Sequence, residues 1–501
     1  MESKLIFRDV VPLMRGANLL VRAVGDQTDE RSCTVCLDAT KIQKGEIYLA
    51  YKGVHHDGHA GIPQAIKRGA AMVIVEDPQA LAACHGLPGV VVKSGREAWS
   101  WLSAKTWGDP QNDLTILGVT GTNGKTSTVW MIKELLRAMG VPCVAIGTLG
   151  AYVGGEHRPT THTTPDPPEL FALLHEAKQR RIVVVAMEVS SHAVEQKKLG
   201  PIRLAAAGFT SFSRDHLDFH ATMEAYLAAK VRVFSEYLAP QGVAYINTLV
   251  AAQIPAQTLP QTTSYYGFED EFQALSVAAE RRLSISLSEE SILGCTVSLQ
   301  WQDKQRAGRV PYFGHPAVAN FVLALALSEY VSGNSIPSSL WQKVRPVPGR
   351  LEIVARKRAE APNVFVDYAH TPDALAKTLG LLRPLTKGKL WVVFGCGGDR
   401  DRGKRPEMGD VAARLADHVV ITSDNPRSED PRSIVEQIKR GISGTTSVTE
   451  QLDREVAIHH AIAHAERDDT VLIAGKGHEA FQTIGTESKA FHDPTVAAAY
   501  L

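Results

Sequence analysis

Short apolar segments alternate with amphipathic segments along most of the chain. LTILGVT at 114–120 is apolar enough for a buried strand, and TSTVWMIKELLRAMG at 126–140 has apolar residues at helical spacing and ends in a glycine. RIVVVAMEVSS, LAAAGFTS and GVAYINT follow as further apolar strands. Apolar strands that alternate with helices are typical of a parallel sheet with helices on both faces. The pattern therefore predicts an α/β protein.

The pattern changes twice, which predicts three domains. Residues 45–77 combine short apolar strands with one amphipathic helix, a small α/β unit, and the proline- and glycine-containing segment 344–354 precedes a second series of buried strands. We expect a small N-terminal α/β domain at 1–111, a central phosphate-loop type parallel sheet at 112–343 and a Rossmann-like α/β domain at 344–501. Shorter alternating segments at 270–312 predict an antiparallel addition to the central sheet.

Composition limits the kind of partner. Lysine plus arginine and aspartate plus glutamate are equal at 54 each among 501 residues, so no excess basic charge favours nucleic acid. Neither a signal peptide nor a membrane-spanning segment is predicted, and six cysteines do not suggest a disulfide scaffold, so we expect a cytoplasmic location. Nothing in the sequence demands a multimer, so a monomer is the default expectation. Cys33 and Cys36 form a C-x-x-C pair, which is a candidate metal or redox site. The alternative is that both are ordinary thiols of the core.

GVTGTNGKTST at 118–128 has the composition of a phosphate-binding loop. Strand, glycine turn, lysine, threonine and helix follow in the required order, although Val119 stands where the G-x-x-x-x-G-K-[ST] pattern has its first glycine. Backbone amides would surround a phosphate, Lys125 would reach the outer phosphates and Thr126 would hold Mg²⁺. The alternative is a plain glycine turn. The predicted nucleotide-binding residues are Gly121, Thr122, Asn123, Gly124, Lys125, Thr126 and Ser127.

Three further polar positions are candidates with ordinary alternatives. Glu188 ends a strand expected beside that of the loop, where it could meet Mg²⁺ or be a solvated acid. SRDHLDFH at 213–220 fits metal ligation or helix capping. Lys230 lies on an amphipathic helix, where a surface lysine is the usual finding. These features are joined in order by HPAVANFVLALA, PGRLE, DYAHTPDAL and GCGGDRDRGKR.

Together these motifs, from about residue 37 to about 493, resemble the Mur ligase family, whose members add amino acids to the peptidoglycan precursor. SDNPRSEDPR and AGKGHE resemble the members that add meso-diaminopimelate to UDP-N-acetylmuramoyl-dipeptide. The resemblance implies that ATP activates a substrate carboxylate as an acyl phosphate, which an amine then attacks. It implies the catalytic residues Lys125, Glu188, His216 and Lys230, with two Mg²⁺ ions. Thr126 and Glu188 would hold one ion; His216 and Lys230, carbamylated by CO₂, would hold the other.

The resemblance also implies substrate contacts. ATP would be met by Arg350, Asp367 and His370 of the last domain, with domain closure completing the site. The UDP-sugar would be met by Leu37, Ala39, Val54, His55, His56, His162, Thr163, Thr164, Ser190, Gln196 and Lys198. Departures from the family pattern stand at Ala39, Thr40, His162, Lys198 and Ser211.

Amino-acid choice is predicted to depend on Arg427, because its planar guanidinium matches the extra carboxylate that distinguishes meso-diaminopimelate from lysine. A surface arginine after a proline turn is the alternative. The implied pocket consists of Arg400, Asp424, Asn425, Pro426, Arg427, Gly475 and Glu479. An L-lysine-adding ligase, a folylpolyglutamate synthetase and a non-catalytic nucleotide-binding regulator remain rival functions.

Overall fold

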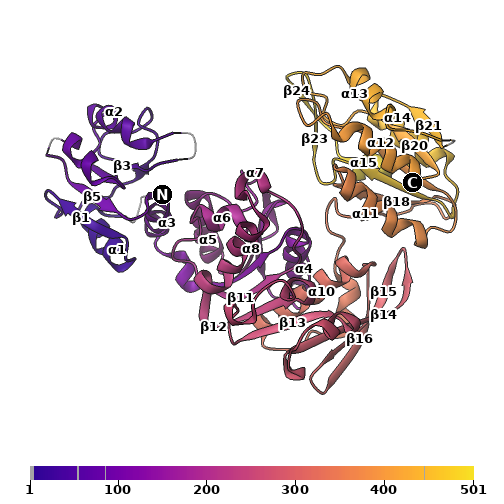
Figure 1. The fold of residues 1–501 in the computed structure, drawn as a ribbon, viewed down its shortest axis with the longest axis horizontal. Coiled ribbons are helices and arrows are strands. Elements are labelled where there is room, and N and C mark those ends of the chain that lie inside the picture. Colours follow the sequence, from indigo (N-terminus) through magenta and orange to yellow (C-terminus); the bar gives the residue numbers. More distant parts are fainter. Residues whose placement is uncertain (1–4, 54–55, 85, 445) are drawn as a thin grey trace. The chain divides into compact units, whose positions relative to one another are not determined.

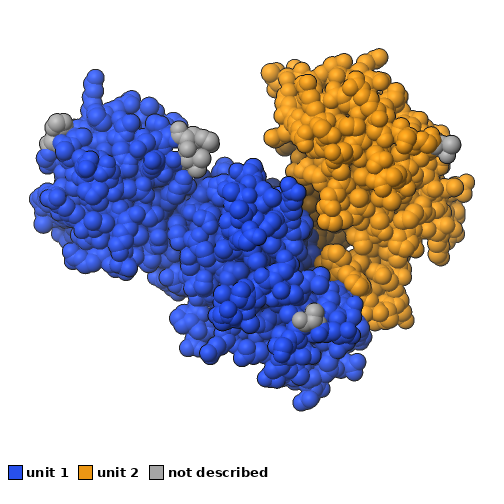
Figure 2. Space-filling model, in the orientation of Figure 1, with its two compact units in different colours: residues 1–286, 298–307, 319–340 blue, residues 287–297, 308–318, 341–501 orange. Residues whose placement is uncertain are grey.

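The computed structural model describes residues 5–53, 56–84, 86–444 and 446–501, which form two compact units (Figure 2). Unit 1 comprises residues 1–286, 298–307 and 319–340, and unit 2 comprises 287–297, 308–318 and 341–501. The α/β class predicted from the sequence is confirmed, whereas the three domain boundaries stay a prediction. Among the described residues, every helix is too short or too polar to cross a lipid bilayer.

The N-terminal part of unit 1 has a five-stranded sheet in the order β1-β5-β4-β3-β2, parallel except for β1 (Figure 1). Its strands and helices bury two apolar clusters. One cluster includes Leu49 and Ile74, and the other includes Val73 and Val75. The bounds are α1 Val10–Gly16, β1 Leu20–Val24, β2 Val35–Cys36, β3 Ile47–Ala50, α2 Ile62–Lys67, β4 Met72–Val75, β5 Gly89–Val92 and α3 Gly95–Thr106.

The central sheet has eleven strands in the order β16-β15-β14-β13-β12-β11-β6-β10-β7-β8-β9 (Figure 1). The six neighbouring strands β13, β12, β11, β6, β10 and β7 pair in parallel, as predicted, whereas β8 and β9 are added to β7 in antiparallel pairs. The predicted addition is present, but β14 joins β13 in parallel rather than antiparallel, which short alternating segments alone do not determine. The strands are β6 Thr115–Thr120, β7 Cys143–Gly147, β8 Gly150–Val153, β9 Glu156–Arg158, β10 Val184–Glu188, β11 Leu204–Phe209, β12 Leu238–Asn247, β13 Thr263–Phe268, β14 Arg282–Ser291, β15 Gly294–Trp301 and β16 Lys304–Val310.

Helices cover this sheet and bury a core that includes Phe171, Val185 and Phe209. α4 begins at Lys125, directly after the glycine turn, and Gly140 follows its end with φ +74°, as the predicted glycine stop requires. The helices are α4 Lys125–Ala138, α5 Pro167–Gln179, α6 Ser191–Glu195, α7 Leu217–His220, α8 Met223–Arg232, α9 Thr248–Ala251 and α10 His315–Ser332.

Unit 2 contains a six-stranded sheet in the order β17-β18-β22-β19-β20-β21, parallel except for β17, and a hairpin of β23 and β24. The four strands predicted for this region are confirmed as β18, β19, β20 and β22. The bounds are β17 Glu352–Val354, β18 Asn363–Asp367, α11 Pro372–Leu382, β19 Leu390–Phe394, α12 Lys404–Leu415, β20 His418–Ile421, α13 Pro431–Lys439, β21 Ser447–Glu450, α14 Arg454–His464, β22 Thr470–Ala474, β23 Phe481–Ile484, β24 Glu487–Ala490 and α15 Asp493–Tyr500.

Candidate functional site

The phosphate loop, residues 121–127, connects β6 to α4. Gly121 has φ +147°, and a Cβ there would lie 1.9 Å from Oγ1 of Thr210. Gly124 has φ +88°, and a Cβ there would lie 2.4 Å from Oδ1 of Asn320. Both positions therefore require glycine. Val119 is a buried residue of β6 itself, so the missing first glycine does not lie in the turn.

The loop is held in shape by its own lysine and by a serine from elsewhere in unit 1. Lys125 Nζ donates to the carbonyl oxygens of Gly121 at 2.8 Å and Thr122 at 2.9 Å. The amide of Asn123 donates to Oγ of Ser211 at 3.0 Å, so the serine found at this departure position supports the loop. Asn320 was not predicted as a site residue. The motif HPAVANFVLALA contains it, but only the fold brings α10 against the loop.

Glu188 lies beside the phosphate loop, as its position in the sequence predicted. β10 pairs with β6 so that Glu188 is opposite Val119. The Glu188 side chain is buried, and its Oε1 accepts from the amide of Thr148 at 2.8 Å. Thr126 and Glu188 line one cavity of about 10 Å³, room for about one water-sized occupant. Apolar residues such as Val129 and Leu149 form most of the cavity wall. Thr126 and Glu188 contribute a hydroxyl and a carboxylate group to the lining residues, and oxygen atoms are the ligands that Mg²⁺ prefers.

Lys230 is buried at 1% exposure, so the usual reading of a surface lysine is wrong. Its Nζ donates to the carbonyl oxygen of Gly121 at 2.7 Å and lies 4.5 Å from the ring centroid of Tyr226. Burial, with the neighbouring charge of Lys125, lowers the pKa of Lys230 well below its ordinary value. This amine is consequently neutral far more readily than an exposed lysine.

His216 and His220 lie against the ring of Tyr226, which Lys230 also contacts. His216 is exposed at the start of α7, with its ring 5.9 Å from the Tyr226 ring and 4.8 Å from that of His192. Burial and the charge of His216 lower the pKa of His192 to about 4. Within the described residues, no three histidine, cysteine, aspartate or glutamate side chains form a ready metal site. A second ion at His216 and Lys230 therefore depends on modification of the lysine.

Predicted UDP-sugar residues cluster at the end of β10. Thr164 Oγ1 donates to the carbonyl oxygen of Glu188 at 2.9 Å and accepts from the amide of Ser190 at 3.1 Å. Thr163 lies within 3.0 Å of Thr148, oxygen to oxygen. Lys198 is buried and pairs with Asp166 at 2.7 Å.

The remaining UDP-sugar residues are less closely joined. His162 is exposed, with Nδ1 3.8 Å from Asp166, and Gln196 caps the end of α6. In the N-terminal sheet region Ala39 is buried, Leu37 is half-buried and His56 is exposed. Val54 and His55 lie outside the described residues.

In unit 2, the predicted ATP residues surround Tyr368. Asp367 ends β18 and accepts from the amides of Leu351 at 2.7 Å and Ala369 at 2.9 Å, while burial raises its pKa. The guanidinium of Arg350 lies 4.9 Å from the centroid of the Tyr368 ring, and the ring of His370 lies 4.7 Å from it. An arginine and a histidine beside an aromatic ring can hold a phosphate-bearing heterocycle.

The residues predicted to hold the amino acid lie in the loops after β19, β20 and β22. Asn425 Nδ2 donates to Glu479 at 2.8 Å, and the buried Lys476, which was not predicted, donates to both side chains. Gly475 has φ +114°, and a Cβ there would lie 2.5 Å from Oδ2 of Asp424, whose pKa is raised by burial. Arg427 is half-buried, Pro426 is buried and Arg400 is exposed.

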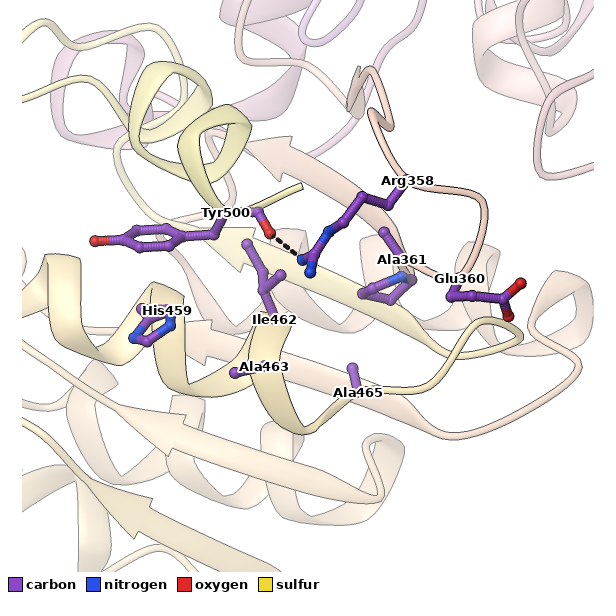
Figure 3. Close-up of a pocket in the computed structure, with 9 residues that line it drawn as sticks. Arg358, Glu360, Ala361, His459, Ile462, Ala463, Ala465 and Tyr500 are labelled. Atoms are coloured by element: carbon purple, nitrogen blue, oxygen red, sulfur yellow. Dashed lines mark hydrogen bonds between the residues drawn. The ribbon is translucent and has the colours of Figure 1, made fainter.

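Another pocket of unit 2, of about 330 Å³, contains none of the predicted site residues (Figure 3). Its wall includes Arg358, which donates to the carbonyl oxygen of Tyr500 at 2.6 Å, and His459. Arg358 thus ties down the C-terminal helix. Its contacts there are structural and do not connect this pocket with the predicted chemistry.

Known proteins resemble the chain over nearly its whole length. Three family descriptions match: "Mur ligase family, catalytic domain" at 34–106, "Mur ligase middle domain" at 119–328 and "Mur ligase, glutamate ligase domain" at 349–477. The UDP-N-acetylmuramoyl-L-alanyl-D-glutamate–2,6-diaminopimelate ligase of Coxiella burnetii is 37% identical over 484 residues, covering 95% of each chain. The protein of the same name from Chromobacterium violaceum is 38% identical over 469 residues, covering 92% of each chain.

Solved structures agree with these matches. A structure of a UDP-N-acetylmuramoyl-L-alanyl-D-glutamate–2,6-diaminopimelate ligase is 31% identical, has a TM-score of 0.69 and covers 100% of this chain and 99% of its own. The MurF ligase of Thermotoga maritima, in complex with ADP, is 17% identical with a TM-score of 0.55, covers 89% of this chain and 94% of its own, and shares the fold.

Proposed function

The chain belongs to the Mur ligase family, and on this premise we propose that it is an ATP-dependent ligase joining meso-diaminopimelate to UDP-N-acetylmuramoyl-L-alanyl-D-glutamate. The products would be the UDP-tripeptide, ADP and phosphate, for peptidoglycan synthesis. The observation that carries this proposal is the identity of 37% to a ligase of this name over 95% of both chains.

The chemistry requires two anions to meet. The substrate carboxylate attacks the γ-phosphate of ATP, which breaks the bond to the bridging oxygen, releases ADP and gives an acyl phosphate. The amine then attacks the acyl carbon, and the tetrahedral intermediate expels phosphate to leave the amide. Positive charge must offset this repulsion. Lys125 and the amides of the phosphate loop, together with Arg350 and His370, are proposed to supply it. The glycines of the loop support this role, because they adopt positive φ values and leave no Cβ to strike Thr210 or Asn320, so the loop backbone keeps its shape.

Mg²⁺ would offset the phosphate charge when bound, with Thr126 and Glu188 as ligands of one ion. We assign a second ion to His216 and a carbamylated Lys230. An ammonium group cannot ligate a cation, whereas a carbamate offers carboxylate-like oxygens. Only a neutral amine adds CO₂, and the buried, pKa-lowered Lys230 is suited to that reaction.

The substrate residues are proposed from the family likeness. Thr163, Thr164, Ser190 and Lys198 would meet the UDP-sugar dipeptide, supported by their grouping at the end of β10 next to Glu188. Arg427, with Asp424, Asn425 and Glu479, would hold meso-diaminopimelate. We further propose that the enzyme acts in the cytoplasm as a monomer, where these small-molecule substrates are its partners.

Phosphate release tests the proposal directly. The purified chain is incubated with ATP, Mg²⁺ and UDP-N-acetylmuramoyl-L-alanyl-D-glutamate, and with meso-diaminopimelate, L-lysine or no amino acid. Phosphate release is measured, and the mass of the product is determined by mass spectrometry. Release that requires meso-diaminopimelate, with a tripeptide product, supports the proposal. Equal use of L-lysine favours the lysine-adding rival, use of a folate in place of the UDP-dipeptide favours a folylpolyglutamate synthetase, and release that ignores the amino acid favours a regulator.

A further inference from the structure

Arg405 and Glu429 form a two-point ion pair inside unit 2. Arg405 Nη1 lies 3.0 Å from Glu429 Oε2, and Nη2 lies 2.9 Å from Oε1. The Arg405 side chain is fully buried and that of Glu429 is 11% exposed. Two parallel, charge-assisted contacts of this kind fix the relative orientation of both side chains.

This pair joins two loops. The first loop, residues 395–403, follows β19, and the second loop, residues 422–430, follows β20. Arg405 Nη2 also donates to the carbonyl oxygen of Gly397 at 3.1 Å, and Glu429 Oε1 also accepts from the amide of Asp399 at 2.7 Å. Both side chains of the ion pair thus contact the first loop. Because Glu429 belongs to the second loop, the pair links the two loops.

Arg427 lies within the joined region. Its Nη1 donates to the carbonyl oxygen of Gly398 at 2.8 Å, and the amide of Gly398 donates to the carbonyl oxygen of Asn425 at 2.9 Å. Arg427 has φ +50°, a conformation that residues with side chains rarely adopt, so the surrounding contacts must maintain it.

We propose that Arg405 and Glu429 are positioning residues, which aim the guanidinium of Arg427 at the far carboxylate of the amino-acid substrate. This inference rests on the proposed function. A planar fork binds a carboxylate at two points only when its orientation is right, so a small displacement of the loops would cost selectivity.

The pair is ionised across the working pH range, because the guanidinium of Arg405 lowers the pKa of Glu429 to about 2. Glu429→Gln therefore removes one charge and keeps nearly the same shape. In the full-length enzyme we expect the KM for meso-diaminopimelate to rise by about tenfold or more, and its preference over L-lysine to fall by about as much. The KM values for ATP and the UDP-dipeptide should change by less than about twofold.

Asp417→Asn is the matched control. Asp417 pairs with Arg383 at 2.6 Å before β20, at the opposite end of that strand from the second loop. This variant should leave both KM and selectivity unchanged. If Glu429→Gln behaves like Asp417→Asn in these two measurements, the proposal is wrong, even if Glu429→Gln is less stable. Should Glu429→Gln fail to fold, Ser428→Ala replaces it. This variant removes a 2.7 Å contact between the Ser428 hydroxyl and Asp399, and we expect the same changes in KM and selectivity, but smaller ones.

Hydrogen exchange tests the positioning role without a measurement of enzyme activity. The amides of Gly398 and Asp399, which donate across the two loops, should exchange faster in Glu429→Gln than in the wild type, while those of β20 do not. Unchanged exchange would overturn the positioning role. A wild type that rejects meso-diaminopimelate would instead overturn the proposed function, with the exchange measurement still valid.

Discussion

Lys230 Nζ lies 2.7 Å from the carbonyl oxygen of Gly121, so a lysine of α8 contacts the first residue of the phosphate loop. An ammonium buried at this place would add to the charge of Lys125, and the lowered pKa of Lys230 reflects both effects. A carbamate at the same position would reverse the sign of the charge and accept a cation.

Replacing Lys230 by alanine should reduce activity by about a hundredfold or more, the size typical for loss of one stabilising group in an active site. Formate or acetate should restore part of the activity, because a small carboxylate can occupy the space of the missing carbamate. Steady-state phosphate release measures both effects. Lys377→Ala, at an exposed lysine of α11, is the control. Full activity of Lys230→Ala would remove the carbamate from the mechanism.

Gly124→Ala should weaken ATP binding by about tenfold or more, because the new Cβ would need the space of Asn320 Oδ1 at 2.4 Å. Gly140→Ala is a close control, since Gly140 also has a positive φ of +74° but has nothing within 4 Å of its Cβ position. Both variants therefore carry the strain of a positive φ, but only Gly124→Ala also places a Cβ against Asn320. Calorimetric titration with ATP should separate the variants; equal affinities would contradict this account of the loop.

Arg427→Lys should raise the KM for meso-diaminopimelate by about ten- to a hundredfold, because lysine cannot make the two-point contact worth about 1.5–3 kcal/mol. The KM for ATP should stay near that of the wild type. Arg432→Lys, at an exposed arginine of α13, controls for loss of a guanidinium nearby. A wild type that uses L-lysine as readily as meso-diaminopimelate would show that Arg427 does not select the substrate.

The stability of unit 1 should fall as pH decreases from 6.5 toward 4. The pKa of His192 is about 4 in the folded chain, below the ordinary value of 6.5 for histidine, so the unfolded chain binds a proton first as the pH falls. After allowance for solvent screening, we expect a loss of about 1 to 2 kcal/mol between pH 7.5 and pH 5. Urea unfolding at both pH values checks this. His192→Gln, neutral throughout, should lose less stability than the wild type; an identical loss would contradict the assignment.

Local patterns predicted the parts of the fold that depend on neighbouring residues. The strand, turn and helix of the phosphate loop and the end of α4 at Gly140 were found because short-range spacing determines them. The approach of Asn320 to the loop, the burial of Lys230 against Gly121 and the contact of Lys476 with Asn425 were not predicted, because they join segments far apart in the chain. Family likeness predicted Lys230 as a metal ligand, which stays a prediction, but its burial against Gly121 was seen only in the fold.

The sequence pattern also did not predict that β14 pairs in parallel with β13. Alternation of apolar and polar positions shows that one face of a strand is buried, but it does not give the direction of its neighbour. Ser211 shows the converse, since a residue that departs from the family pattern supplies a hydroxyl oxygen that accepts from the amide of Asn123.

A Cβ on Gly398 would lie 1.8 Å from the carbonyl oxygen of Pro426, so the loops after β19 and β20 touch with no space for a side chain. Anyone grafting the DNPR segment of another ligase into this scaffold would therefore need to transplant the partner segment at the same time. Changed substrate preference should come more readily from paired exchange of both segments than from random mutation of either.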